Sequence, residues 1–325
     1  MIRIQSLLRL SFPALLLLSP FVVAKTPYPD RPVKIIVPFE VGAPDVLARI
    51  YAKQLTSQTG QSFIVENKPG ANGMIGADFV AKSKADGYTL LLTSTSIVVN
   101  PSFYKKTAYD LKKDLTPITN LGNVEGLLIV VNPSLQVNTL GEFIALAKNN
   151  LGKFSFSSPG AGNQLHIDSE FFNKLTGLEM THIPYKGAGP AAVALLGNQV
   201  QLFISTPPVV LPHIQSGKLK ALAYTGQKRF SLLPDVPTTT EAGLPSFNVD
   251  GGWFGLFAPK GIPQDINLDI YMEFKKAAQD GDTRNTILNL GMDPTTPKPV
   301  EFQNLVDRET KKYSDKIRLI ELKQE

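Results

Sequence analysis

Short apolar runs alternate along most of this chain with segments whose apolar residues recur at helical spacing. Val33–Val37 is a short run of the kind found in buried strands. Residues 45–59 have helical spacing, because Val46, Leu47, Ile50 and Leu55 fall on one face. The pattern then predicts a strand at 63–66, a helix ending near 84 and a strand at 88–93. This strand–helix repeat indicates a parallel sheet covered on both faces.

The same pattern begins again after Ile118. We expect strands at 127–131, 154–157, 179–183, 200–204 and 219–224, with helices at 139–149, 163–175 and 190–196. Two later segments, 266–278 and 300–319, are again helical and are expected to pack on the first region. No linker separates the regions. We therefore predict an α/β protein in which a second lobe, 124–251, is inserted into a first, 25–123 plus 252–325.

Two α/β lobes joined by two crossings enclose a cleft. Ligands of open α/β sheets bind beyond the carboxyl ends of the strands. Functional residues are therefore expected in the loops that leave strands and enter helices.

The N-terminus resembles a cleaved export signal. Residues 1–24 begin with Arg3 and Arg9, continue through an apolar run, and end in small residues at Ala24. The run is too short and too often interrupted for a membrane anchor. The sequence predicts export, with cleavage near Ala24 and a periplasmic mature protein of about 300 residues, which is enough for two cores.

Composition excludes several classes of function. The chain contains no cysteine, which rules out disulfides, thiolate metal sites and a lipid-modified N-terminal cysteine. Its net charge of +5 is spread along the sequence, without the basic stripe expected of a nucleic-acid-binding protein. The three histidines, His166, His182 and His213, lack metal-ligand spacing. We therefore expect no metal, no cofactor and no nucleic-acid partner.

Four loops have the composition of anion sites. The first, 38–45, places Gly42 and Ala43 before a helix that Asp45 is expected to cap, and free amides at a helix start attract carboxylates. The second, 93–96, is four consecutive hydroxyl residues. The third, 157–163, is rich in small residues and ends at Asn163, a predicted N-cap. Ordinary capped helices and turns are the structural alternatives.

A fourth loop, 183–189, offers Tyr185 as a wall and Lys186 as a cation, although a solvated lysine is an equal alternative. The third loop matches neither a dinucleotide fingerprint nor a nucleophile elbow. An exported hydrolase or transferase using Ser157 and Ser158 with His166 nevertheless remains an alternative. A ligand sensor for a membrane signalling protein is another.

Several motifs resemble one family. Asn67–Gly76 (NKPGANGMIG), Ala85–Leu90 (ADGYTL), Ile183–Gly187 (IPYKG) and Pro234–Thr238 (PDVPT) are similar to sequences of the solute-binding receptors of tripartite tricarboxylate transporters, the Bug family. The resemblance implies a type II periplasmic-binding-protein fold, no enzymatic activity, a carboxylate ligand held largely by backbone amides and hydroxyls, and two integral-membrane transporter subunits as partners of a monomer. Dicarboxylates, tricarboxylates, acidic amino acids and aromatic acids all suit such a site.

The family's four binding loops fall on the four loops above. Carried over position by position, they predict these ligand-binding residues: Phe39, Val41, Gly42, Ala43, Asp45, Thr93, Ser94, Thr95, Ser96, Ser158, Gly160, Ala161, Gly162, Asn163, His166, Tyr185, Lys186, Gly187 and Ser205. The first loop departs from the family pattern. It is one residue shorter, has Ala43 in place of a glycine, and adds a negative charge at Glu40.

Overall fold

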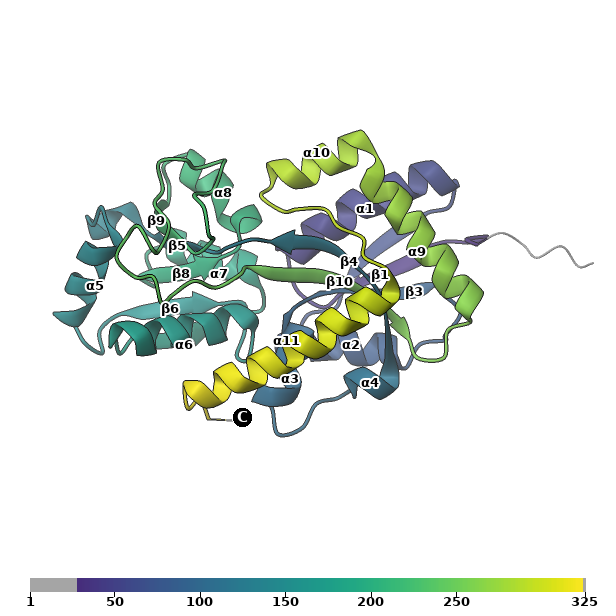
Figure 1. Cartoon of the computed structure of the whole chain (residues 1–325), viewed down its shortest axis with the longest axis horizontal. Coiled ribbons are helices and arrows are strands. Elements are labelled where there is room, and N and C mark those ends of the chain that lie inside the picture. The colour runs from purple at the N-terminus through teal and green to yellow at the C-terminus, as the bar shows by residue number, and fades with distance from the viewer. Residues whose placement is uncertain (1–27, 324–325) are drawn as a thin grey trace, which may run out of the picture.

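The computed structural model describes residues 28–323, so the predicted export signal at 1–24 lies outside the described residues. The strands form two five-stranded sheets side by side along the long axis of the molecule (Figure 1). Their orders are β2-β1-β3-β10-β4 and β7-β6-β8-β5-β9. All strands of the second sheet lie in sequence between β4 and β10 of the first, so each sheet has its own half of the molecule.

The first sheet is mixed. Three strands are parallel, and β10 runs antiparallel between β3 and β4. The strands are β1 (Val33–Val37), β2 (Phe63–Asn67), β3 (Thr89–Ser94), β4 (Leu115–Val124) and β10 (Gly252–Pro259). The helices of this half are α1 (Ala43–Thr59), α2 (Met74–Ala81), α3 (Ser96–Phe103), α4 (Leu111–Asp114), α9 (Gln264–Gln279), α10 (Gly281–Asn289) and α11 (Pro299–Leu319), with a 3-10 turn at Ala71–Gly73.

The second sheet is mixed in the same way, because β5 is antiparallel to both β8 and β9. Its strands are β5 (Leu128–Val131), β6 (Ser155–Ser158), β7 (Thr181–Pro184), β8 (Leu202–Ser205) and β9 (Lys220–Tyr224). Its helices are α5 (Leu140–Lys148), α6 (Gln164–Thr176), α7 (Ala188–Leu196) and α8 (Pro207–Gln215), with a 3-10 turn at Pro133–Leu135.

Each half is stabilised by burial. One face of the first sheet packs on α1, α9 and α10, and the other packs on α2, α3 and α11. The second sheet has a separate core, centred on the wholly buried Phe143, Phe156, Phe172 and Phe203. Completely burying an aromatic or aliphatic side chain contributes roughly 1.5–3 kcal/mol, so two cores of this size stabilise the chain without disulfides.

The C-terminal helix connects the halves. Figure 1 shows α11 crossing from the first half towards α6 of the second. Phe302, Val306 and Tyr313 of α11 are buried against the first half. Near its end, Lys316 Nζ lies 2.5 Å from Asp168 Oδ1 on α6. The helix therefore packs on the first half, as expected, and also contacts the second.

Two predictions about the elements were wrong. The sheets are mixed rather than parallel, because β10 in the first sheet and β5 in the second run antiparallel to both of their neighbours. Asp45 does not cap α1, since the helix begins two residues earlier and Gly42 takes the N-cap position. The chain crosses between the halves beside two long strands, β4 and β10, which the sequence did not predict. Thr139 and Asn163 do cap their helices, each accepting an amide hydrogen bond.

Candidate ligand-binding site

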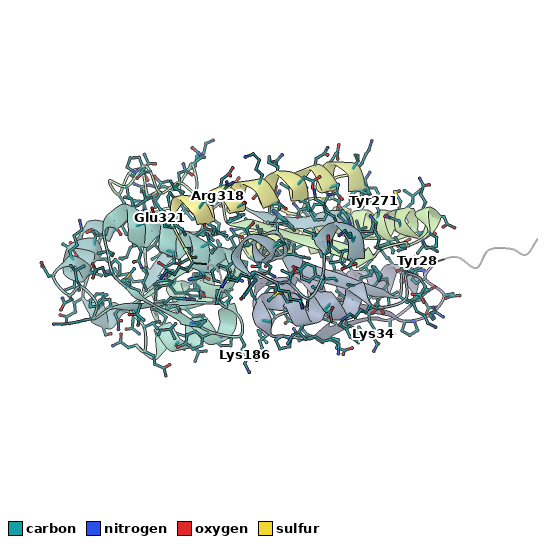
Figure 2. All side chains as sticks on the ribbon, turned by 90° about the horizontal axis from the view of Figure 1, so that it is seen from below. Tyr28, Lys34, Lys186, Tyr271, Arg318 and Glu321 are labelled. Carbon is teal, nitrogen blue, oxygen red and sulfur yellow. The ribbon has the colours of Figure 1, made fainter. Side chains whose placement is uncertain are left out.

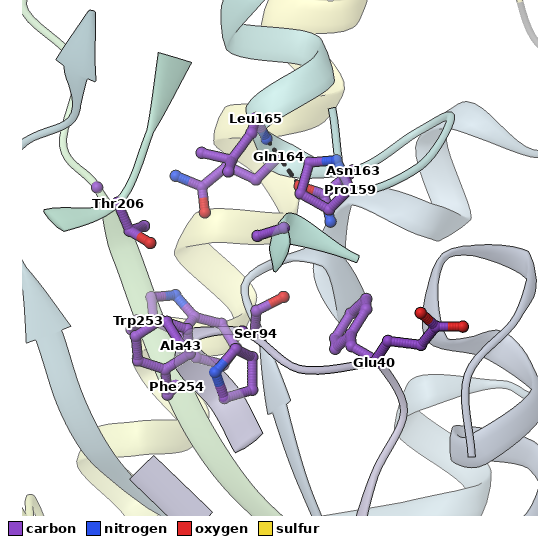
Figure 3. Close-up of a pocket in the computed structure, with 15 residues that line it drawn as sticks. Glu40, Ala43, Ser94, Pro159, Asn163, Gln164, Leu165, Thr206, Trp253 and Phe254 are labelled. Atoms are coloured by element: carbon purple, nitrogen blue, oxygen red, sulfur yellow. Dashed lines mark hydrogen bonds between the residues drawn. The ribbon is translucent and has the colours of Figure 1, made fainter. Parts of the chain in front are cut away.

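A cavity lies between the two halves. The empty space between its walls totals about 470 Å³, a figure that includes open solvent. Figure 3 shows residues of both halves facing one another across it. It is lined by Phe39, Glu40, Gly42, Ala43, Pro44, Ser94, Pro159, Asn163, Gln164, Leu165, Ala188, Thr206, Gly251, Trp253 and Phe254.

Strand direction explains why these residues meet. The cavity residues follow β1, β3, β6, β7 and β8, so the carboxyl ends of these strands in the two sheets face each other. Trp253 and Phe254 lie near the beginning of β10, which is antiparallel and so starts at the same edge. This is the position at which open α/β sheets bind ligands.

Two helix starts point into the cavity. Helix α1 begins with Gly42 and Ala43, and α7 begins with Gly187 and Ala188; Gly42, Ala43 and Ala188 line the cavity. The first amides of a helix have no acceptor within the helix, and the helix dipole adds a partial positive charge. Together these starts provide donors from both halves, suited to an anion.

The side chains give the cavity little charge. None of the described residues that line it is Lys, Arg or His, and Glu40 is the one ionisable residue among them. Figure 3 shows the Glu40 carboxylate directed to one side, away from Ser94 and Trp253. An anion in this cavity must therefore be neutralised by amides and hydroxyls, since no cationic side chain is available there.

The halves touch at the mouth of the cavity through the main chain. The amide of Gly189 donates to the carbonyl of Val41 at 3.0 Å, and the amide of Glu40 donates to the carbonyl of Lys186 at 3.3 Å. Both bonds join the first loop to the start of α7. Gly187 also packs closely on Glu40, so this side of the cavity is closed.

Side chains close the opposite side. Asn163 Nδ2 donates to Asn72 Oδ1 at 3.0 Å, and the Tyr104 hydroxyl donates to the carbonyl of Ala161 at 2.7 Å. The amide of Gln164 donates to the Ser96 hydroxyl at 3.3 Å. All three bonds run between the halves, so the structure is a closed arrangement in which the third loop contacts the first half.

The structure places part of the predicted first loop in the cavity. Phe39, Gly42 and Ala43 line it. The Val41 side chain is 64% exposed and does not line the cavity. Its main-chain carbonyl accepts the hydrogen bond from the Gly189 amide. Asp45 is buried outside the cavity, where its carboxylate accepts hydrogen bonds from Arg49 and Asn67 and so holds the beginning of α1 against β2.

The second loop, 93–96, contributes one residue to the cavity wall, Ser94. Thr93 is buried within β3, and Ser96 accepts the hydrogen bond from Gln164. Thr95 Oγ1 accepts from the amide of Trp253 at 2.9 Å, which holds the end of β3 to the beginning of β10. Three of the four hydroxyl residues therefore have structural positions and do not line the cavity.

The third loop contributes Asn163, together with Pro159 from the same loop. Gly160 and Gly162 have φ values of 151° and 68°, which only glycine adopts readily. Gly162 lies against Phe103 of the other half, with no room for a side chain. Ala161 contributes its carbonyl to the contact with Tyr104.

The fourth loop lies at the mouth. Neither Tyr185 nor Gly187 is among the described lining residues. Lys186 is exposed, and Figure 2 shows its side chain directed out of the molecule, as the solvated-lysine alternative expected. Ser205 is buried, and its hydroxyl donates to the carbonyl of Thr206, which lines the cavity instead.

Neither Ser157 nor Ser158 pairs with His166, the pairing that the hydrolase alternative required; Ser158 contacts His182 instead. His166 is buried; its Nδ1 accepts from the amide of Gly162 at 3.1 Å, and its Nε2 lies 3.6 Å from Glu170. His182 stacks on His166 with ring centroids 3.7 Å apart, and its Nε2 lies 2.6 Å from Ser158 Oγ. Ser158 is completely buried, so this pair supports the third loop and does not face the cavity.

The histidine pair predicts a loss of stability in acid. Burial, together with the neighbouring His166, lowers the pKa of His182 to about 3. In the unfolded chain His182 has a pKa of about 6.5 and is protonated below that pH, whereas in the folded chain it stays neutral down to about pH 3. Protonation therefore favours the unfolded state, and the free energy of unfolding falls as the pH drops from about 6.5 towards 3. We expect the free energy of unfolding in urea to be about 2 kcal/mol lower at pH 5 than at pH 7.5 from this group alone.

The control for this prediction is His182→Gln, which keeps a hydrogen-bonding side chain without an imidazole. In that variant the dependence between pH 5 and 7.5 should be smaller by about the same 2 kcal/mol. An unchanged pH dependence would mean that His182 is not the group responsible.

Several cavity residues were not predicted from the sequence. They are Pro44, Pro159, Gln164, Leu165, Ala188, Thr206, Gly251, Trp253 and Phe254. Most follow directly after a predicted residue, so extending each loop by one or two positions into its helix would have found them. Gly251, Trp253 and Phe254 gave no such signal, since 252–259 was not assigned as a strand.

Across the described residues, no cluster of three or more His, Asp or Glu side chains is arranged to hold a metal ion. No helix within residues 28–323 is both long and apolar enough to span a bilayer.

Comparison with known proteins agrees with this geometry. Residues 47–322 match the family described as "Tripartite tricarboxylate transporter family receptor". The chain is 38% identical over 299 residues to the protein BugT of Bordetella pertussis (strain Tohama I), covering 91% of each. Two solved structures superimpose closely: the periplasmic binding protein BugD (31% identity, TM-score 0.87) and R. palustris Rpa4515 with adipate (30%, TM-score 0.88). The chain covers 100% of each, and 92% of the chain is matched.

The family match extends over both halves of the chain. The matched structures agree with the fold of a periplasmic binding protein. The chain therefore belongs to the tripartite tricarboxylate transporter receptors, the Bug family of solute-binding proteins, and is not an enzyme.

Proposed function

We propose that this protein is an exported receptor that captures a small dicarboxylate between its two lobes and delivers it to the membrane subunits of a tripartite transporter. The lobes are 25–123 with 252–325 and 124–251. The separation of the strands into two sheets, with β4 ending at Val124 and β10 beginning at Gly252, supports this division.

One observation carries the proposal. The beginnings of α1 and α7, from opposite halves, present amides to a common cavity that contains no cationic side chain among the described residues. We assign one carboxylate to the amides of Gly42 and Ala43 and the hydroxyl of Ser94. Ala188 and Thr206 provide donors on the other wall for a second polar group.

Hydrogen bonds supply a large part of the binding free energy. A hydrogen bond to a charged group contributes roughly 1.5–3 kcal/mol. Three or four such bonds contribute about 4.5–12 kcal/mol before ordering costs are subtracted, a range that includes the ~8 kcal/mol of a micromolar complex. Because the donors come from both halves, the full set is available only when the halves are closed. Ligand binding therefore favours the closed form.

The family and the predicted leader support the location and the partners that we assign. A cleavable signal at 1–24 directs the chain to the periplasm, and the mature receptor acts as a monomer. The closed form, with both halves joined at the mouth, is the shape that two membrane subunits recognise. The adipate bound to the R. palustris relative supports a dicarboxylate as the ligand class.

The proposal is tested by a thermal-shift panel on the mature protein. We use succinate, malate, adipate, citrate, aspartate and benzoate, with succinamide as the neutral control and putrescine as the cationic one. A dicarboxylate at 100 times its dissociation constant should raise the melting temperature by roughly 5 °C or more, with one-to-one stoichiometry and no product. If succinamide stabilises the protein as much as the acids do, the carboxylate assignment is wrong.

A further inference from the structure

One wall of the cavity contains a buried donor without an acceptor. Trp253 is the one tryptophan in the chain, and its side chain is only 3% exposed. Its indole Nε1 finds no hydrogen-bond acceptor among the described residues. Trp253 lines the cavity (Figure 3), and no other lining residue has a buried polar atom left unpaired. Native proteins rarely leave such a group unsatisfied, so a missing partner points to a ligand or an ordered water.

The indole cannot turn away to find an acceptor elsewhere. The main chain of Trp253 is bonded on both sides to Thr95, whose amide donates to the Trp253 carbonyl at 3.0 Å and whose hydroxyl accepts from its amide. The ring packs edge-on against Phe302 with centroids 5.2 Å apart, and Phe257 lies beside it. The N–H is therefore held at a fixed place in the wall.

An acceptor from the other half lines the same cavity, beyond direct hydrogen-bond reach of this donor. Gln164 is the first residue of α6, and Figure 3 shows its carboxamide extending towards Trp253. Its Nε2 donates to the carbonyl of Asp250 at 3.4 Å, which leaves the Oε1 as the free acceptor. That oxygen occupies the space that a side chain at Gly252 would fill, next to Trp253 in the sequence. Gln164 and Trp253 both line the cavity.

A fixed donor and a fixed acceptor in the same cavity match a hydroxyl group, which both donates and accepts. A bare carboxylate would place a negatively charged oxygen against the Gln164 Oε1, which would repel it. A methylene group would leave the indole N–H without a hydrogen-bond partner. We propose that the Trp253 N–H and the Gln164 carboxamide form a subsite for a ligand hydroxyl, so that this receptor prefers hydroxy-dicarboxylates to their unsubstituted analogues. This inference rests on the proposed function, because it assumes that dicarboxylates bind in this cavity.

The first test compares malate with succinate, which differ by one hydroxyl. Isothermal titration should give the wild type roughly tenfold tighter binding of malate, because the polar pair is left unsatisfied by succinate. Trp253→Phe keeps the ring and removes the N–H, so it should lose most of this preference. The matched control is Phe254→Leu, a lining residue without a polar atom, which should weaken both ligands while the preference remains.

The second test needs no variant. Because the chain has one tryptophan, a ¹⁵N-tryptophan-labelled sample gives one indole N–H resonance. Malate should move that resonance downfield as the hydrogen bond forms, and succinate should move it much less. A purely structural role for Trp253 predicts no difference between the two ligands.

The outcomes separate the two proposals. If succinate and malate bind equally well and the indole resonance responds to neither, the hydroxyl subsite is wrong while the dicarboxylate receptor stands. If no acid of the thermal-shift panel binds, the proposed function fails and this inference fails with it. A Trp253→Phe variant that folds and keeps the tenfold preference would also overturn it.

Discussion

Replacing Gly189 by valine should weaken dicarboxylate binding by about 100-fold or more while leaving the protein folded. A Cβ built at Gly189 would lie 2.5 Å from the carbonyl oxygen of Val41, which belongs to the opposite half. The same carbonyl accepts the hydrogen bond from the Gly189 amide that closes the mouth of the cavity. A valine there holds the halves apart, so the ligand reaches the donors of one half only. Losing two charge-assisted hydrogen bonds accounts for a change of this size.

The control for this variant is Gly141→Val. Gly141 is the second residue of α5, as Gly189 is of α7, and both helices lie in the second half. A Cβ at Gly141 would have the Thr139 hydroxyl, 4.0 Å away, as its nearest neighbour. Isothermal titration with the same acid should give wild-type affinity for Gly141→Val. Wild-type affinity for Gly189→Val as well would show that the halves do not close as this structure has them.

Replacing Lys316 by methionine should lower the free energy of unfolding at pH 7.5 by roughly 3–5 kcal/mol. Asp168 is completely buried, Lys316 Nζ lies 2.5 Å from its Oδ1, and its Oδ2 has no hydrogen-bond partner among the described residues. Methionine preserves the apolar stem near Phe171 and Tyr313 but removes the positive charge that contacts the carboxylate. An unpaired buried charge is among the most costly changes in a protein.

The pH dependence of this variant has a definite sign. Burial already raises the pKa of Asp168, and Lys316 opposes that effect. Without the lysine the folded-state pKa rises further above the unfolded value. The contribution that the protonated Asp168 carboxyl makes to stability is then fully present below the unfolded pKa of about 3.9. It is lost as the pH rises through the folded-state pKa. Part of the destabilisation at pH 7.5 should therefore be recovered near pH 5.

Lys311→Met on the same helix is the matched control. Lys311 pairs with Asp315, but both side chains are largely exposed, at 79% and 47%. Exposed pairs contribute roughly 0–1 kcal/mol, so urea unfolding should be nearly unchanged. Equal effects of the two substitutions would show that Asp168 and Lys316 are not a buried pair.

The sequence predicted the elements whose signals are local. Apolar runs located β1, β2 and β3, and capping residues located the beginnings of α5 and α6, because Thr139 and Asn163 bond to amides two or three residues away. The prediction failed at Asp45, whose type suits an N-cap but whose carboxylate is held by Arg49 and Asn67. It failed at β10 because an apolar strand containing two glycines does not alternate.

The cavity was predicted in part. Phe39, Gly42, Ala43, Ser94 and Asn163 are in loops that leave strands, and strand direction brings those loops together. Trp253 and Gln164 were missed because their significance depends on a contact between segments almost 90 residues apart. No local pattern marks an indole N–H that lacks a partner. Which hydroxyls face the cavity, as Ser94 does, and which bond to the main chain, as Thr95 does, is also decided only by the packed structure.

The measurement that tests closure around a carboxylate most directly is a distance between the halves. The chain has no cysteine, so Lys82→Cys on the first half and Lys148→Cys on the second, both at exposed positions, provide two spin labels without other changes. Double electron–electron resonance should show a broad or longer distance distribution without ligand, and a single shorter distance with a saturating dicarboxylate but not with succinamide. Identical distributions with and without a dicarboxylate that titration shows to be bound would contradict the account.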